Sequence, residues 1–149
     1  MEKAIYSSIE QAVNAVNDQV MVRYGYLSEV QGQNLKLPMV LVTPMATTVE
    51  STVVGLMIKN SYTVKAMCLF GDTYGKPTDA RAAGRMTSRL DIYDQAQTML
   101  EAIFNQVAKD YGGQANVLAG TIEPVQLVSS QTLTGKAITF RVVELKSYC

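Results

Sequence analysis

The sequence predicts an α+β protein: an antiparallel or mixed sheet of about six strands, with two helices packed on one face. Two segments repeat apolar residues with the period of a helix, and six others show the alternation or short apolar runs of strands. The strand-like segments follow one another in hairpin fashion, which favours α+β over a parallel α/β arrangement. With 149 residues, 48% of them hydrophobic, one domain over residues 1–149 is expected.

The first helix is expected over residues 3–18. Its apolar side chains recur every three or four positions and share one face, while acidic and amide residues occupy the other. Residues 20–27 change to a two-residue alternation, which is typical of a strand. Residues 37–43 form an almost wholly apolar run with a proline near each end, as expected of a strand covered on both faces.

A tight hairpin is predicted at residues 59–61. The flanking segments, 47–59 and 61–70, are both rich in β-forming residues, and Asn60 accepts the left-handed conformation that a short turn needs. In the second segment, alternate residues from Tyr62 onward form one strongly apolar face. The two segments are therefore expected to pair as neighbours.

Residues 71–90 interrupt this pattern with three glycines, a proline and few large apolar residues. Arg81, Arg85 and Arg89 would share one side of a helix, but Gly84 and the scarcity of apolar residues make such a helix marginal. We expect an exposed arm or loop with a basic edge. That edge is either a solvated, salt-bridged face or a subunit contact; phosphates are a less favoured partner, because no aromatic residues alternate with the arginines.

A second helix is expected over residues 91–110. Asp91 stands where an N-cap belongs, a broad apolar stripe follows, and Gly112 and Gly113 provide the stop. Two closing strands are expected over residues 116–128 and 136–145.

The composition gives little support to catalysis or metal binding. The chain has no His, which excludes Ser-His-Asp and Cys-His catalysis and every His-ligated metal site. No glycine-rich phosphate motif is present, and the two cysteines lack metal-ligand spacing. Asp91 and Asp94, or Asp72 and Asp79, could form acid pairs, but a cap and a first-turn acid explain the first pair better. No catalytic residue, cofactor or metal ligand is assigned, and an enzyme using Tyr, Lys or Asp alone has no constellation behind it.

Charge and targeting signals favour a soluble, intracellular protein. Thirteen basic and thirteen acidic residues give zero formal charge, which argues against a general grip on nucleic acid or anionic lipid. No apolar run approaches the ~20 residues of a membrane helix, and the first twenty residues lack the apolar core of a signal peptide. Cys68 is interpreted as a small buried hydrophobe.

Several pieces of the chain occur in a distinctive order. An amphipathic helix is followed by LPMVLVTP, the tyrosine-led strand SYTVKAMCLFG, a glycine-rich arm, the helix DQAQTMLEAIFNQVAKD and a last strand that starts LTGKAITFRV. This layout resembles small structural proteins of the head–tail junction of tailed phages, especially the tail-terminator and neck-ring group. The arm at residues 71–90 is longer than expected for that group.

The resemblance implies a non-enzymatic virion component, made in the cytoplasm of a bacterial host, whose copies form a head-to-tail ring in the head–tail connector or tail terminator. Its partners would be other copies of itself, neighbouring portal-side or tail proteins and, transiently, DNA in a channel, with no membrane. The residues alone also allow a small-molecule- or peptide-binding α+β domain that acts as a monomer or dimer. The oligomeric state separates these two hypotheses.

Overall fold

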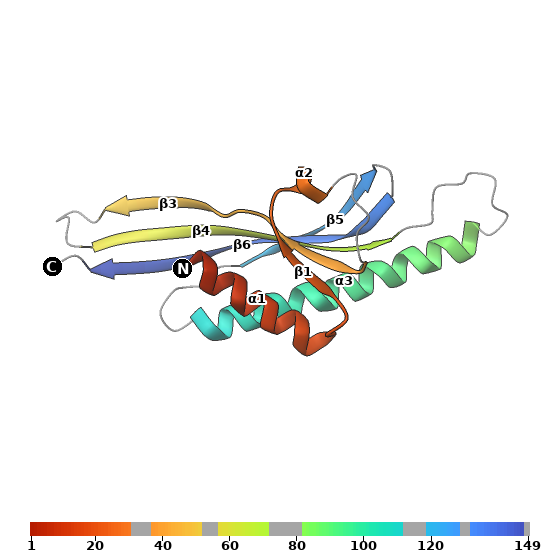
Figure 1. Cartoon of the computed structure of the whole chain (residues 1–149), viewed down its shortest axis with the longest axis horizontal. Coiled ribbons are helices and arrows are strands. Elements are labelled where there is room, and N and C mark those ends of the chain that lie inside the picture. Colours follow the sequence, from red (N-terminus) through yellow and green to blue (C-terminus); the bar gives the residue numbers. More distant parts are fainter. Residues whose placement is uncertain (31–36, 52–56, 72–81, 112–118, 129–131, 148–149) are drawn as a thin grey trace.

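The computed structural model describes residues 1–30, 37–51, 57–71, 82–111, 119–128 and 132–147 (Figure 1). Its elements, in chain order, are α1 (Glu2–Val16), β1 (Met21–Tyr24), α2 (Leu27–Val30), β2 (Met39–Val42), β3 (Ala46–Ser51), β4 (Met57–Gly71), α3 (Ala82–Tyr111), β5 (Thr121–Val128) and β6 (Thr132–Ser147). The predicted α+β class with a six-stranded mixed sheet is confirmed, and the sheet is open.

The sheet is organised around two long central strands. Its order is β1-β2-β4-β6-β5, and β3 pairs with the part of β4 that precedes the β2 contact. Among the described strands, β1 and β2 run parallel and the other pairs are antiparallel. β4 pairs with β6 along its whole length, from Met57 opposite Ser147 to Gly71 opposite Leu133. These two strands therefore connect all parts of the sheet.

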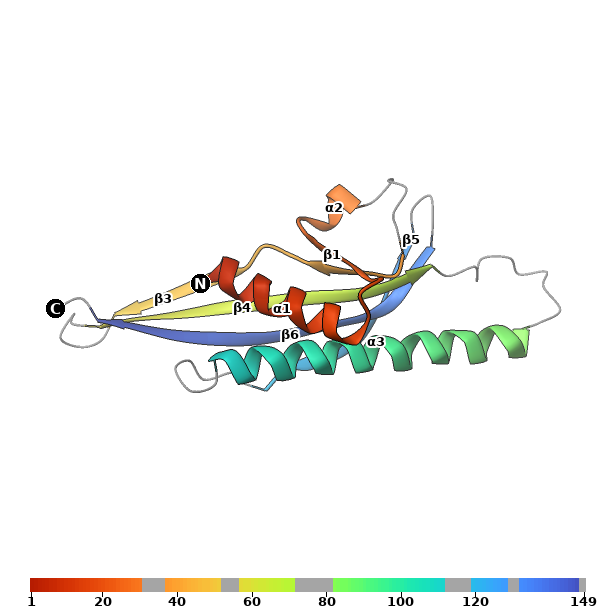
Figure 2. The same cartoon turned by 60° about the horizontal axis from the view of Figure 1, so that its bottom comes forward.

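Helices α1 and α3 lie side by side on one face of the sheet, as predicted (Figure 2). The 3.6-residue period places Ile5 and Ile9 of α1, and Leu100 and Ile103 of α3, in a core without solvent exposure. The sheet contributes alternate residues to this core, and these are Val40, Val42, Tyr62, Val64, Ala66, Cys68, Ile138, Phe140 and Val142. The apolar face predicted from Tyr62 onward is confirmed.

A smaller core covers part of the opposite face of the sheet. It contains Met39, Leu41, Met67, Leu69, Leu133 and Ala137, with Leu27 of α2 and two residues of β5 packed against it. All four residues of β2 are buried, because Val40 and Val42 face the helices while Met39 and Leu41 face the smaller core. The interpretation of residues 37–43 as a strand covered on both faces is confirmed.

The predicted hairpin turn at residues 59–61 is wrong. β4 runs without interruption from Met57 to Gly71, and Asn60 lies within it, opposite Val49 of β3 and Glu144 of β6. The connection between β3 and β4 falls in residues 52–56, outside the described residues. Pairing on both sides of β4 outweighs the local turn preference of Asn60, because strand propensity depends strongly on cross-strand context.

The predicted boundary between arm and helix is also wrong. α3 begins at Ala82, so residues 82–90 are helical, and Asp91 lies inside the helix instead of capping it. Once a helix is nucleated, extension costs little, and Gly84 lowers its stability by only about 1 kcal/mol. The helix ends at Tyr111, directly before the two glycines expected to stop it. The rest of the arm predicted over residues 71–90, namely residues 72–81, lies outside the described residues.

Candidate functional site

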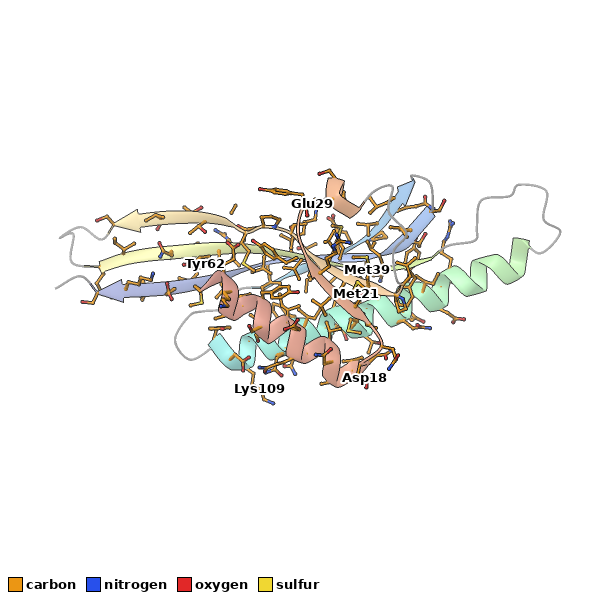
Figure 3. All side chains as sticks on the ribbon, in the orientation of Figure 1. Asp18, Met21, Glu29, Met39, Tyr62 and Lys109 are labelled. Atoms are coloured by element: carbon orange, nitrogen blue, oxygen red, sulfur yellow. The ribbon has the colours of Figure 1, made fainter. Side chains whose placement is uncertain are left out.

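The most distinctive surface is a three-stranded extension that projects beyond the helices (Figure 1). We call it the ribbon and define it as residues 46–51 of β3, 57–63 of β4 and 141–147 of β6. Tyr62 lies where the ribbon leaves the helix layer, and Lys109 points outward from α3 (Figure 3). The Tyr62 hydroxyl lies 3.5 Å from the Glu144 carboxylate, across the β4–β6 pair. The ribbon is thus continuous with the core at its base.

Both long edges of the ribbon lack a partner strand within the described residues. On one side, β3 pairs only with β4. On the other side, β5 pairs with residues 132–139 of β6, so residues 141–145 extend beyond its end. Alternate backbone N–H and C=O groups of such edges point away from the sheet and can pair with another strand. The ribbon therefore offers two different edges for association.

The side chains of the ribbon suit a contact surface. All residues of β3 are exposed, and two large apolar side chains stand out, Val49 at 63% and Leu145 at 55% exposed. Val49 is aligned with Asn60 and Leu145 with Lys59, so these two apolar residues occupy opposite faces. Glu50 lies 4.0 Å from Lys59, a spacing that contributes little to stability at an exposed site.

The opposite end of the molecule is formed by the start of α3, which extends past the sheet (Figure 2). Of the three arginines proposed as a subunit contact, Arg81 lies outside the described residues and Arg85 is placed only by its position in the helix. Arg89 is half-buried, whereas the adjacent Leu90 is 60% exposed. The assignment of these arginines to an interface stays a prediction.

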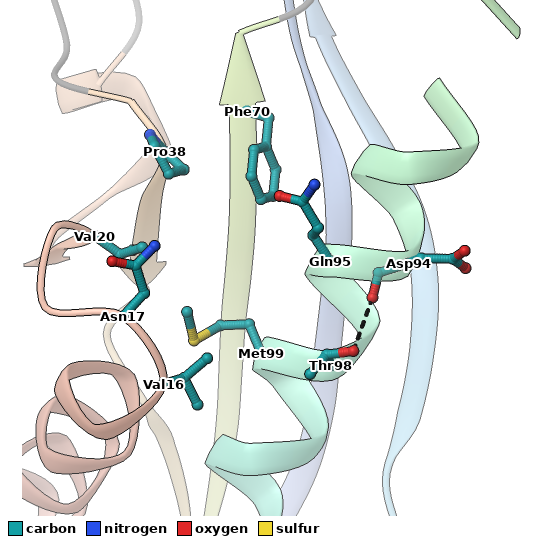
Figure 4. Close-up of a pocket in the computed structure, with 9 residues that line it drawn as sticks. All are labelled: Val16, Asn17, Val20, Pro38, Phe70, Asp94, Gln95, Thr98 and Met99. Atoms are coloured by element: carbon teal, nitrogen blue, oxygen red, sulfur yellow. Dashed lines mark hydrogen bonds between the residues drawn. The ribbon is translucent and has the colours of Figure 1, made fainter. Parts of the chain in front are cut away.

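A cavity of about 350 Å³ lies between the end of α1, the end of β4 and the middle of α3 (Figure 4). It is lined by Val16, Asn17, Val20, Pro38, Phe70, Asp94, Gln95, Thr98 and Met99. The Asp94 carboxylate points away from the other lining residues, and the Thr98 hydroxyl donates to the Asp94 main-chain oxygen at 3.1 Å. The groups that remain are mainly apolar side chains and two carboxamides, which suit binding better than acid–base chemistry.

A second cavity, of about 440 Å³, lies at the start of α1 and is lined by Glu2, Lys3, Tyr6 and Tyr24. The Tyr24 hydroxyl donates to the Glu2 carboxylate, and this hydrogen bond is the main reason why the pKa of Tyr24 is raised to about 12. The Tyr6 and Tyr24 rings pack edge to face with their centroids 5.6 Å apart. A phenol with so high a pKa is a hydrogen-bond donor at neutral pH and a poor general base.

Cys68 and Gly135 have structural roles. Cys68 is buried, and desolvation raises the pKa of its thiol to about 12, which confirms its interpretation as a small core residue. Gly135 lies in β6 against the Cys68 carbonyl of β4, where a side chain would collide with the main chain.

Sequence reasoning missed the role of Lys136. Its ammonium group donates to Oε1 of Gln97 at 3.0 Å and lies 5.9 Å from the centre of the Tyr93 ring, so it joins β6 to α3. It also missed Val49 and Leu145, because their exposure depends on where the helices end relative to the sheet. The spacing of residues in the sequence does not indicate where the helices end relative to the sheet.

No protein-family model matches the chain, and no curated protein matches its sequence. Within the ranges that the structure describes, no cluster of three or more acidic or cysteine residues is placed to hold a metal ion. Among the described helices, none combines the length and apolar character needed to cross a membrane.

Proposed function

We propose that this protein is a ring-forming structural subunit of the head–tail junction of a tailed phage, as a connector or tail terminator. The observation that carries the proposal is the ribbon, an extension with two dissimilar open edges and exposed apolar residues on both faces. The order of segments along the sequence supports the same class. The proposal places the protein in the virion, in contact with portal-side or tail proteins, and includes no catalytic role.

Ring formation requires a heterologous contact, in which two different surfaces of each subunit meet. The ribbon alone provides two, because the edge of β3 and the edge of β6 lie on opposite sides of β4. Because the ribbon projects beyond α1 and α3, these helices do not obstruct a second copy that pairs with its edges (Figure 1). Zero formal charge also allows many copies to pack closely without strong mutual repulsion.

The proposed ring would surround a channel through which DNA passes. Lys65 and Arg141 are exposed on the sheet face that points away from the helices, and each is aligned with a threonine on the neighbouring strand. Cationic and hydroxyl side chains are common partners of phosphate oxygens. This face is therefore the one that we assign to transient DNA contact.

Light scattering coupled to size-exclusion chromatography tests the proposal, together with electron microscopy of the peak fraction. We expect a discrete oligomer of several copies with a central channel. The variant Val49→Lys/Leu145→Lys should be monomeric with an unchanged circular dichroism spectrum, because both positions are exposed and edge lysines oppose strand association. The control variant Glu10→Lys/Gln11→Lys, on the exposed side of α1, should still assemble. A wild-type chain that stays monomeric at every concentration would contradict the proposal.

The cavity between α1 and α3 favours a second candidate, a small-molecule- or peptide-binding domain. About 350 Å³ of space with mainly apolar walls and two carboxamides is within the size range of ligand sites. Its test is a thermal-shift screen of wild type against Met99→Trp, which would fill the cavity. A ligand that raises the melting temperature of wild type alone, in a chain that remains monomeric, would favour this candidate.

A further inference from the structure

We propose that neighbouring copies join by continuing the sheet: residues 141–145 of β6 in one copy pair, in parallel, with residues 46–50 of β3 in the next. This inference rests on the proposed ring and specifies the contact between neighbouring copies, which we call the seam. Three observations support it. The ribbon edges are more open to strand pairing than the other edges of the sheet, a second copy of the chain fits them, and β3 and β6 run in the same direction.

The other edges of the sheet carry features that normally discourage strand addition. β5 has Pro124 near its middle, and β1 is only four residues long. β3 has neither proline nor lysine, and its sequence ATTVES is rich in threonine and valine, which favour strands. Residues 141–145 of β6 also lack proline. Thus, among the described strands, the ribbon edges are the most open to pairing.

A second copy of the chain fits both edges at once. Each edge offers a stretch of five residues, one from β3 and one from β6. Glu50 is the only charged residue of β3, whereas residues 141–145 of β6 contain both Arg141 and Glu144, so the β6 edge has no net charge that would repel β3 of a second copy. Pairing would also place Val49 of one copy and Leu145 of the other beside a new neighbouring strand, on opposite faces of the continued sheet, and would partly cover each.

Strand direction distinguishes a ring from a twofold dimer. β3 and β6 are both antiparallel to β4, so they run in the same direction. Rotation about a ring axis leaves the direction of a strand along that axis unchanged, so β6 meets the β3 of the next copy in parallel. A twofold axis would instead pair β3 with β3, or β6 with β6, in antiparallel fashion.

Cross-linking between copies tests the seam. Two variants are made in a Cys149→Ser background, Thr48→Cys and Leu145→Cys, whose side chains share the sheet face away from the helices. The variants carry different tags and are co-expressed, and the product is treated with a short bismaleimide. The remaining native thiol, Cys68, is buried and does not compete. We expect a covalent heterodimer from the co-expressed pair and no covalent dimer from either variant alone.

Each other outcome is informative. Co-expression of Thr48→Cys with Gln11→Cys, on the exposed side of α1, should give no heterodimer. Cross-linking of either variant with itself would overturn the seam in favour of twofold pairing. Closed rings without the heterodimer would overturn the seam and leave the proposed function standing. If the covalent heterodimer forms but the oligomers are open and of unlimited length, the seam is supported and the ring is overturned. A monomer that gives no cross-links would overturn both the seam and the ring.

Discussion

At the scale of single residues, Gly135 leaves the least room for a side chain among the described glycines. A Cβ atom at this position would lie 1.7 Å from the carbonyl oxygen of Cys68, which is main chain and cannot move aside cheaply. Glycine therefore allows β6 to approach β4 closely at the register of Leu69 and Gly135. The close packing of β6 against β4 explains why a glycine stands at position 135. The sequence contains no glycine-rich phosphate motif that would give it a nucleotide-binding role.

We expect Gly135→Ala to reduce the free energy of unfolding by about 1–3 kcal/mol, the usual cost of overpacking. The matched control is Gly120→Ala, whose Cβ would lie 3.2 Å from Cβ of Phe140 and need only a small adjustment. Urea denaturation of both variants measures the difference. Equal stability of Gly135→Ala and wild type would show that β6 does not approach β4 as described.

The contact between Ser8 and Asp110 predicts a pH dependence. Hydrogen bonds from the Ser8 hydroxyl at 2.5 Å, and then from the Gln106 amide, lower the pKa of Asp110 below its ordinary value of 3.8. Because the folded pKa is depressed, the stabilisation is complete above pH 3.8 and is lost as the pH falls through the folded pKa.

Ser8→Ala should therefore be less stable than wild type at pH 7, by about 0.5–1.5 kcal/mol for one lost hydrogen bond. The difference should shrink as the pH falls below 3.8. Denaturation midpoints at several pH values measure it. In an Asp110→Asn background the effect of Ser8→Ala should vary little with pH, and an equal variation there would rule out Asp110 as the titrating group.

At the scale of elements, the sequence predicts best what short-range periodicity controls. The repeat of Ile5 and Ile9 locates α1, and the apolar run around β2 indicates burial on both faces. Prediction fails where long-range pairing decides, because Asn60 has the local features of a turn and becomes a strand residue only through its neighbours in β3 and β6. The start of α3 was missed because residues 82–90 lack an apolar stripe of their own.

The candidate site was less predictable than the fold. The spacing of Arg81, Arg85 and Arg89 is visible in the sequence and is the basis for the subunit contact predicted there. The ribbon edges exist only because β5 ends its pairing at Thr139 while β6 continues, and because β3 joins the far end of β4. These are properties of topology, and neither residue type nor local period reports them.

The packing of α3 gives a prediction with an internal control. Leu100 is fully buried and Leu90 is 60% exposed on the same helix. Leu100→Ala should cost about 2–5 kcal/mol through lost burial and the resulting cavity. Leu90→Ala should change the stability by no more than about 0.5 kcal/mol. Chemical denaturation compares the two, and similar losses would mean that the buried face of α3 is misassigned.

At the scale of the whole molecule, the ribbon and the start of α3 lie at opposite ends (Figure 2). The two hypotheses for the subunit contact place it at different ends of the molecule. One uses the edges of the ribbon, and the other uses the arginines near the start of α3. The ribbon hypothesis depends on backbone pairing and apolar contact. The arginine hypothesis depends on charge, so the effect of salt on assembly separates them.

Replacement of Arg81, Arg85 and Arg89 by serine should leave the melting temperature of the monomer nearly unchanged, with any loss arising at half-buried Arg89. If the arginines hold a neighbour, assembly of the variant should weaken, and wild-type assembly should weaken as salt is raised. Light scattering at two ionic strengths measures both effects. Unaltered assembly of the triple variant would exclude this interface, and a collapsed monomer would show that the arginines serve the fold.

The pairing of β4 with β6 over fifteen consecutive residues has a mechanical consequence. The hydrogen bonds between antiparallel strands lie perpendicular to the strand axis. A pull on the ribbon along that axis loads the whole ladder in shear, so many bonds share the force at once. A pull across the strands would open them one at a time. Tension on the ribbon therefore passes lengthwise to the part of the sheet held by α1 and α3, and the molecule resists stretching far better than peeling.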